Sequence, residues 1–148
     1  MRRAKPLHMT ITIYHYPECG TSTHTLQIIR DAGYDPDVVE YMKAGWTKPQ
    51  LQELFEAAGL SARRALRIHK TNAKELGLTE DGVSEGAILD AMVEFPKLVN
   101  RPIVVTKKGT ALCRPSEVVL DLLENWPAGP YATKNGDPLI DEDGQRVD

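Results

Sequence analysis

Cys19 is the residue of this 148-residue chain whose position most clearly suggests chemistry. It opens the segment Cys-Gly-Thr-Ser, between a stretch with strand character and the start of a predicted helix. The first turn of a helix has unpaired backbone N–H groups and the positive end of the helix dipole, so a thiolate there is stabilised and its pKa falls. Gly20 lets the backbone approach a ligand closely, and Thr21 and Ser22 offer hydroxyl groups. The segment therefore predicts a nucleophilic cysteine.

The spacing around Cys19 argues against several other cysteine chemistries. A dithiol oxidoreductase needs a second cysteine three positions later, where this chain has Ser22. A cysteine phosphatase loop needs an arginine six positions later, where this chain has threonine. His15, Cys19 and His24 would offer only three candidate ligands, so no metal site is expected. What remains is a monothiol whose second sulfur comes from elsewhere.

The elements that would position Cys19 indicate an α/β fold. Ile11 and Ile13 share one face of an alternating stretch, as in a strand, and Thr47 and Gln50 have capping-box spacing. The predicted elements are a strand at 9–14, a helix capped by Thr21 or Ser22 and ended by Gly33, a strand at 37–41, helices after Thr47, Ser61 and Ser84, strands at 103–106 and 110–113, and a helix at 115–124. The order β-α-β, helical insert, β-β-α predicts a thioredoxin-like mixed sheet.

One domain is expected, with a short segment at each end. Residues 1–8 read as a flexible extension, residues 9–126 as the thioredoxin-like domain with its helical insert at about 46–96, and residues 127–148 as an acidic tail. The tail accounts for the whole net charge of −3. Its composition favours a solvated segment, although the Asn135-Gly136 and Asp143-Gly144 turns would allow a small hairpin laid on the body.

Composition narrows the possible functions. The body of the chain is electrically neutral, which argues against nucleic-acid binding through a broad basic face. No apolar run is long enough to span a membrane or to act as a signal peptide. Two cysteines do not build a disulfide scaffold. A cytoplasmic, thiol-reducing setting is therefore expected.

Three arginines have unusual positions in this predicted fold. Arg101 comes directly before Pro102 at the start of a strand, where thioredoxin-like folds place a residue that faces the active cysteine across a cis-proline. Arg114 lies at a junction of strand and helix on the same rim, and Arg67 falls in the helical insert, from which it could close over the cysteine loop. Because a guanidinium matches a tetrahedral oxyanion with paired N–H groups, these residues predict an oxyanion site.

Four segments carry a family resemblance: Ile-Thr-Ile-Tyr-His-Tyr-Pro-Glu-Cys-Gly-Thr-Ser at 11–22, Ala-Leu-Arg at 65–67, Asn-Arg-Pro-Ile-Val-Val-Thr at 100–106 and Leu-Cys-Arg-Pro-Ser-Glu-Val-Val-Leu-Asp at 112–121. Through these segments, the sequence resembles the glutaredoxin-coupled arsenate reductases over about residues 9–125. The resemblance implies a thioredoxin-like fold, an arsenate substrate, a glutaredoxin partner, and glutathione as co-substrate with no bound cofactor.

The resemblance also assigns roles to residues. It implies that Cys19 attacks arsenate, that His15 helps to tune the cysteine, and that Cys113 is not needed for turnover. The implied oxyanion binders are Arg67, Arg101, Arg114 and the loop residues Gly20, Thr21 and Ser22. Two positions depart from the family pattern: Tyr16 replaces an asparagine, and Thr23 replaces an arginine.

Two other functions are compatible with such a fold. One is a thiol-sensing regulator that binds RNA polymerase, but it would favour a Cys-x-x-Cys motif. The other is a monothiol glutaredoxin-like carrier of iron–sulfur clusters, but it would need neither the helical insert nor the arginines.

Overall fold

The computed structural model describes residues 9–133 and 135–147, so the predicted extension at 1–8 lies outside the described residues. The described residues form strands, α-helices and short 3-10 helices (η) in the order β1 (Thr12–His15), α1 (Gly20–Asp31), β2 (Asp37–Glu40), α2 (Tyr41–Ala44), α3 (Lys48–Ala58), α4 (Ala62–Ala65), α5 (Glu85–Glu94), η1 (Pro96–Leu98), β3 (Ile103–Thr106), β4 (Gly109–Leu112), η2 (Ser116–Leu122), β5 (Tyr131–Ala132) and β6 (Pro138–Ile140).

A four-stranded mixed sheet organises the domain and confirms the predicted fold class. Its strand order is β2-β1-β3-β4, with β1 parallel to β2 and β3 antiparallel to both of its neighbours. Helix α1 is the crossover between the two parallel strands, as expected for a βαβ unit. The peptide bond between Arg101 and Pro102, just before β3, is cis, as the sequence predicted.

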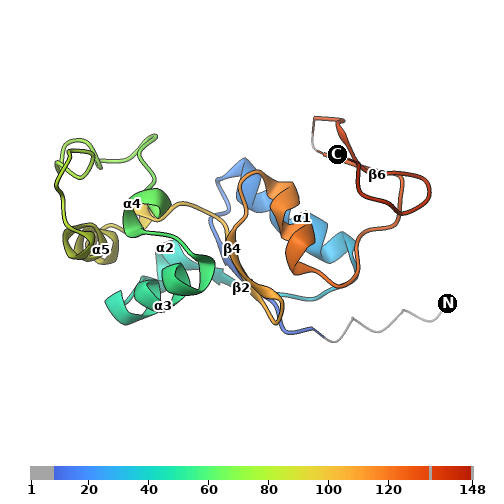
Figure 1. Cartoon of the computed structure of the whole chain (residues 1–148), viewed down its shortest axis with the longest axis horizontal. Coiled ribbons are helices and arrows are strands. Elements are labelled where there is room, and N and C mark those ends of the chain that lie inside the picture. The colour runs from blue at the N-terminus through green and yellow to red at the C-terminus, as the bar shows by residue number, and fades with distance from the viewer. Residues whose placement is uncertain (1–8, 134, 148) are drawn as a thin grey trace.

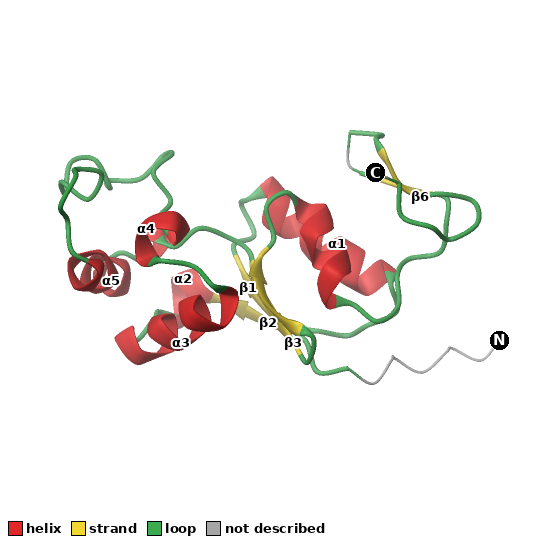
Figure 2. Ribbon diagram, in the orientation of Figure 1, coloured by secondary structure: helices red, strands yellow, loops and turns green. Residues whose placement is uncertain are grey.

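The sheet separates two layers of helices. Helices α1 and η2 lie on one side, and the insert helices α2 to α5 lie on the other (Figure 1; Figure 2). The strands alternate accordingly: Ile13 and Val104 belong to the core under α1 and η2, whereas Tyr14 and Ile103 belong to the core under the insert. The cysteine loop, between β1 and α1, is thus held between two packed layers.

Local sequence signals set most helix ends. Thr47 forms both hydrogen bonds of the predicted capping box at the start of α3, and Gly59 ends that helix with a left-handed φ of 67°. The hydroxyl groups of Ser61 and Ser84 accept from the first turns of α4 and α5, as expected of N-caps. Glu85 also accepts from the backbone N–H of Ala62, which joins α4 to α5.

Two of the sequence-based expectations about helices are wrong. The N-cap of α1 is Cys19 rather than Thr21 or Ser22, because the helix already starts at Gly20. The last predicted helix is present and is of the tighter 3-10 type. The spacing of the apolar residues after Ser84 predicts that Val93 is buried, but Val93 is 36% exposed, because α5 buries only one face.

The C-terminal segment packs on the domain rather than remaining solvated. Strands β5 and β6 form the hairpin that the turn residues allowed, and Leu139 and Ile140 are buried in the core under α1. The Tyr131 hydroxyl donates to the Asp31 carboxylate at the end of α1 (2.6 Å). The tail is therefore part of the same folded body.

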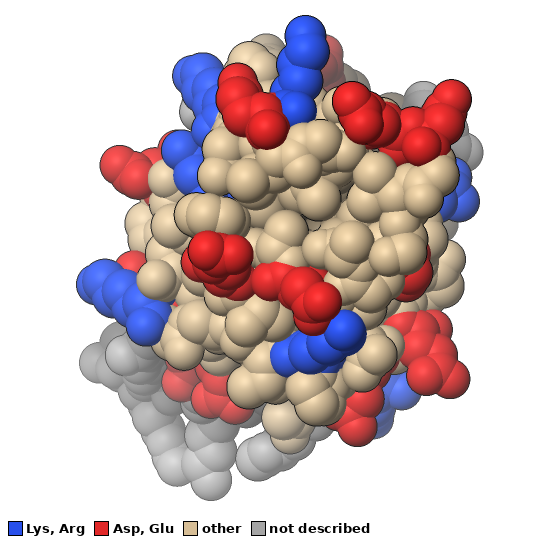
Figure 3. Space-filling model, turned by 90° about the vertical axis from the view of Figure 1, so that its left-hand side faces the viewer, with Lys and Arg blue, Asp and Glu red and all other residues tan. Residues whose placement is uncertain are grey.

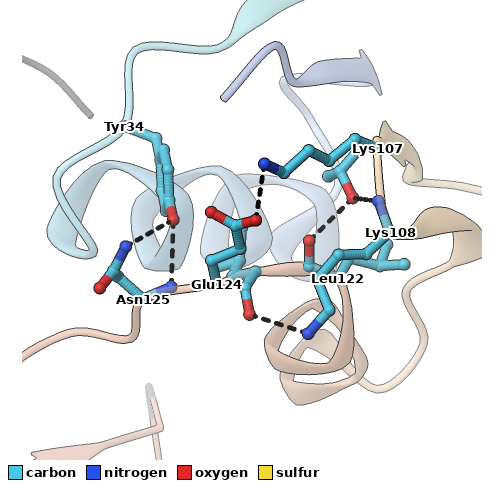
Figure 4. A network of polar contacts seen from close by, with 8 residues as sticks. Tyr34, Lys107, Lys108, Leu122, Glu124 and Asn125 are labelled. Atoms are coloured by element: carbon cyan, nitrogen blue, oxygen red, sulfur yellow. Dashed lines mark hydrogen bonds and ion pairs between the residues drawn. The ribbon is translucent and has the colours of Figure 1, made fainter. Parts of the chain in front are cut away.

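A polar network holds the end of η2 against the sheet (Figure 4). Asn125 donates to the Tyr34 hydroxyl through its backbone and its side-chain amide, at 3.0 and 3.2 Å. Lys107, in the turn between β3 and β4, pairs with Glu124 at 2.7 Å, and Thr106 donates to the last carbonyl of η2. These contacts fix the segment that leads from the sheet to the tail.

The face formed by the insert carries basic and acidic side chains interspersed with uncharged ones (Figure 3). Among the described residues, no helix is both long and apolar enough to cross a membrane.

Candidate active site

Cys19 stands at the N-cap of α1 with a partly exposed side chain. Burial by itself would raise the pKa of its thiol. The backbone N–H groups of Ser22 and Thr21 and the guanidinium of Arg114 outweigh burial, so the pKa of Cys19 lies below its ordinary value. The start of the helix therefore stabilises a thiolate, as the sequence pattern predicted from the helix N-terminus.

Arg114 directly contacts the thiol of Cys19. It follows β4 by two residues, and its Nη1 lies 3.7 Å from the Cys19 sulfur. The same nitrogen donates to the backbone carbonyl of Arg101 at 2.9 Å. This hydrogen bond fixes the guanidinium of Arg114 against the backbone of Arg101.

Arg101 is almost completely buried, with 3% of its surface exposed. Its Nη1 donates to the carbonyl of Lys97 at 3.0 Å, and the guanidinium carbon lies 4.5 Å from the centre of the Tyr16 ring. Its Nε is buried and has no hydrogen-bond partner among the described residues. A buried guanidinium with unused N–H capacity is poised for an anion.

Arg67 lies just after α4 rather than on a helix. Its backbone N–H donates to the carbonyl of Leu98 at 2.7 Å, and the adjacent Leu66 forms an antiparallel bridge with Val99. Arg67 is therefore tied to the segment that leads into β3. Burial lowers the pKa of its guanidinium, and the charges of Arg101 and Arg114 lower it further.

Arg67, Arg101 and Arg114, the arginine trio, concentrate positive charge in one pocket. Among the described residues, none of the three forms an ion pair with a carboxylate. Like charges brought together in this way destabilise one another unless an anion joins them. The trio is therefore an oxyanion-binding arrangement beside a nucleophile.

His15 contacts the cysteine loop through Ser22. Its Nδ1 lies 2.6 Å from the Ser22 hydroxyl oxygen, which also accepts from the Tyr16 backbone N–H at 3.1 Å. Burial is the main cause of the lowered pKa of His15, and it favours the neutral form of the ring. His15 is thus placed to orient Ser22, whose backbone N–H stabilises the Cys19 thiolate.

The Ser22 hydroxyl is less available for ligand binding than the sequence suggested. The Ser22 side chain is fully buried and occupied by His15 and Tyr16, so it does not face a ligand. Gly20 and Thr21 do line the pocket. Backbone N–H groups, rather than the hydroxyl of Ser22, are the donors that this loop offers.

Tyr16 has a role that sequence reasoning missed. The sequence showed Tyr16 only as the replacement of an asparagine. In the structure, its ring packs against the guanidinium of Arg101. Its hydroxyl donates to Glu18 at 2.7 Å, and its carbonyl accepts from the Cys19 N–H at 3.0 Å. The sequence does show an aromatic residue three positions before the cysteine, but only the fold shows that this residue packs against Arg101.

A pocket of about 800 Å³ contains Cys19, Gly20, Thr21 and the arginine trio. It therefore brings together most of the site residues expected from the sequence. Among the described residues, there is no cluster of three or more His, Cys, Asp or Glu side chains suited to a metal ion.

Alkylation of Cys19 by iodoacetamide is expected to show a thiol pKa below the ordinary value of about 8.5. The reason is the stabilisation by backbone N–H groups and by Arg114. The rate is measured against pH, with Cys19→Ser giving the background. A midpoint at or above 8.5 would contradict the prediction.

Thr23→Arg supplies a further check, because it adds a positive charge to the exposed side of the first turns of α1 and should lower the midpoint. Gln27→Arg adds the same charge one turn further along the helix, also at an exposed position. It should move the midpoint less, since the effect of a charge falls with distance.

Cys113→Ala is expected to keep most of the activity and to lower the free energy of unfolding by on the order of 1 kcal/mol. Cys113 is fully buried, and burial raises the pKa of its thiol to about 12, so it is a core residue rather than a reactive thiol. Steady-state turnover and thermal unfolding measure the two effects. Complete loss of turnover in a folded variant would instead identify a resolving thiol.

Comparisons with known proteins agree on one family. The sequence model described as the ArsC family matches residues 14–122. An arsenate reductase, ArsI2, from Synechocystis sp. is 62% identical over 137 residues, which cover 93% of this chain and 98% of that protein. An arsenate reductase from Escherichia coli K12 is 44% identical, covering 93% and 97% of the two chains. The solved arsenate reductase from Vibrio cholerae superposes with a TM-score of 0.74 at 36% identity, covering 78% of this chain and 98% of its own.

Proposed function

The chain belongs to the ArsC family, and we propose that it reduces arsenate to arsenite through the Cys19 thiolate, with glutathione and a glutaredoxin supplying the electrons. The observation that carries the proposal is the arginine trio. Three guanidinium groups line one pocket with a thiol of lowered pKa, and no described carboxylate forms an ion pair with any of them. Arsenate is a tetrahedral oxyanion that fits both the charge and the donor geometry.

The first step is nucleophilic. The Cys19 thiolate forms a sulfur–arsenic bond, and one arsenate oxygen takes up protons and leaves as water. The arginine trio neutralises the oxyanion, so that an anionic thiolate can approach it. Backbone N–H groups at the start of α1 hold the thiolate in place until it reacts.

The second step transfers two electrons. A glutathione thiolate attacks the sulfur of the adduct, the sulfur–arsenic bond breaks, and its electron pair stays on arsenic as As(V) becomes As(III). Arsenite leaves, and Cys19 remains in a disulfide with glutathione until a glutaredoxin reduces it. Counted as neutral species, arsenic acid and two thiols give arsenous acid, one disulfide and one water.

The need for external thiols follows from the cysteines of this chain. Ser22 occupies the position of a resolving cysteine, and Cys113 is buried with a raised thiol pKa. Neither residue is suited to release the Cys19 adduct. Glutathione therefore serves as a co-substrate.

Arsenate-dependent oxidation of NADPH tests the proposal in a mixture of the protein, glutathione, glutaredoxin and glutathione reductase. Oxidation is expected with arsenate and not with phosphate, which the arginine trio would bind but which thiols do not reduce. Phosphate should instead compete with arsenate. Absence of arsenate-dependent oxidation by the folded protein would overturn the proposal.

A further inference from the structure

The pocket around Cys19 extends well beyond the arginine trio. Its volume of about 800 Å³ lies in the range that accommodates drug-sized organic ligands, whereas arsenate has a single central atom with four oxygens. The additional lining comes from the insert, from η1 and from the C-terminal hairpin, and it includes Lys70, Lys97 and Asp137. The pocket therefore has room and functional groups for a second, larger reactant.

Lys70 and Lys97 extend the positive charge of the pocket. Neither lysine forms an ion pair with a residue that the structure describes. Lys97 lies on η1, whose backbone also accepts from Arg101. Lys70 has a left-handed φ of 58°, a conformation that is uncommon outside glycine and is often found at functional sites.

Carboxylates line the same pocket. Glu18 comes from the cysteine loop, Glu117 from η2, and Asp137 from the turn before β6. These three also form no ion pair within the described part of the chain. A pocket that keeps separate, unpaired cations and anions fits a ligand that carries both carboxylate and ammonium groups.

We infer that Lys70 and Lys97 bind a carboxylate of the glutathione that attacks the Cys19 adduct, an inference that rests on the proposed function. Glutathione has two carboxylates and one ammonium group at neutral pH, together with the thiol that the reaction needs. Held by its carboxylate on the insert side of the pocket, it would direct the thiol towards Cys19, and Asp137 would face its ammonium group. The arginine trio remains free for arsenate.

The Lys70→Gln/Lys97→Gln variant tests this inference by steady-state kinetics. The KM for glutathione is expected to rise about tenfold, while the KM for arsenate changes by less than about threefold. Glutathione diethyl ester, which lacks the carboxylate charges, should show a raised KM with the unmodified protein and little further penalty with the variant. The matched control is Lys43→Gln/Lys74→Gln, which removes the same charge from exposed lysines outside the pocket.

Binding of S-methylglutathione, measured by calorimetry, separates this inference from the proposed function. This probe keeps the charges of glutathione but has no free thiol. The unmodified protein and the control variant are expected to bind S-methylglutathione, and the Lys70→Gln/Lys97→Gln variant is expected to bind it about tenfold more weakly. That result would support the glutathione site even if the protein did not turn over arsenate. If the variant matches the control in binding and in glutathione KM, or if the arsenate KM rises equally, the inference is wrong.

Discussion

Replacing Arg101 with alanine is expected to raise the KM for arsenate by about tenfold to a hundredfold. Each hydrogen bond from a charged group contributes about 1.5–3 kcal/mol, and Arg101 is a buried guanidinium with an unpartnered Nε in the pocket wall. Its loss also removes the cation that packs on Tyr16. Steady-state kinetics at saturating glutathione and glutaredoxin measure the change.

One further variant shows whether the positive charge of Arg101 is sufficient or whether its paired N–H groups are needed, and a second variant is the control. Arg101→Lys keeps the charge but loses the paired N–H geometry, so it should remain clearly impaired. Arg64→Ala removes an exposed arginine of α4 outside the pocket and should leave kcat/KM unchanged. Near-native kcat/KM for arsenate in Arg101→Ala, and in the corresponding Arg67 and Arg114 variants, would show that the trio does not bind the substrate.

Cys19→Ser is expected to abolish arsenate reduction, with a loss on the order of a thousandfold or more. A serine hydroxyl is nearly the same size as the thiol, but the N–H groups that stabilise a thiolate do not make it a comparable nucleophile. The rate of arsenate-dependent NADPH oxidation reports the loss.

The fold of Cys19→Ser should be unchanged, because the side chain is partly exposed and α1 has no side-chain cap at this position. Thermal unfolding and the binding of phosphate as an unreactive oxyanion provide the controls. A folded variant that keeps more than about a tenth of the rate would place the nucleophile elsewhere.

Much of the fold was predictable because local signals and global topology agree. The capping box at Thr47 and the helices that start after Ser61 and Ser84 all appear as expected. The strand pattern was likewise visible in the sequence. These features depend on residues close together in the chain.

The parts of the site that the sequence did not show depend on contacts between residues distant in the chain. The sequence placed Arg67 in the helical insert but did not show that its backbone hydrogen-bonds to Leu98, in the segment that leads into β3. Ser22 was expected to offer a hydroxyl, but His15 and the backbone of Tyr16 occupy it. No periodicity or capping rule reports which side chain a fold brings to a given hydroxyl or carbonyl.

The C-terminal tail shows the same limit. Its acidic charge favoured solvation, yet the apolar pair Leu139 and Ile140 packs under α1, and Asp137 reaches the pocket. Gly129 permits this packing, because a Cβ there would overlap the carbonyl oxygen of Asp141. Composition describes the average of a segment, whereas a few residues decide where it docks.

The arsenic product offers the most direct test that Cys19 reduces arsenate. Chromatographic separation of arsenate and arsenite, after incubation with glutathione and glutaredoxin, should show arsenite accumulating with the unmodified protein in step with NADPH consumed. Cys19→Ser, measured beside it, should form none above the level without protein. Arsenite formation by Cys19→Ser at the rate of the unmodified protein, or NADPH consumption without arsenite, would contradict the Cys19 mechanism.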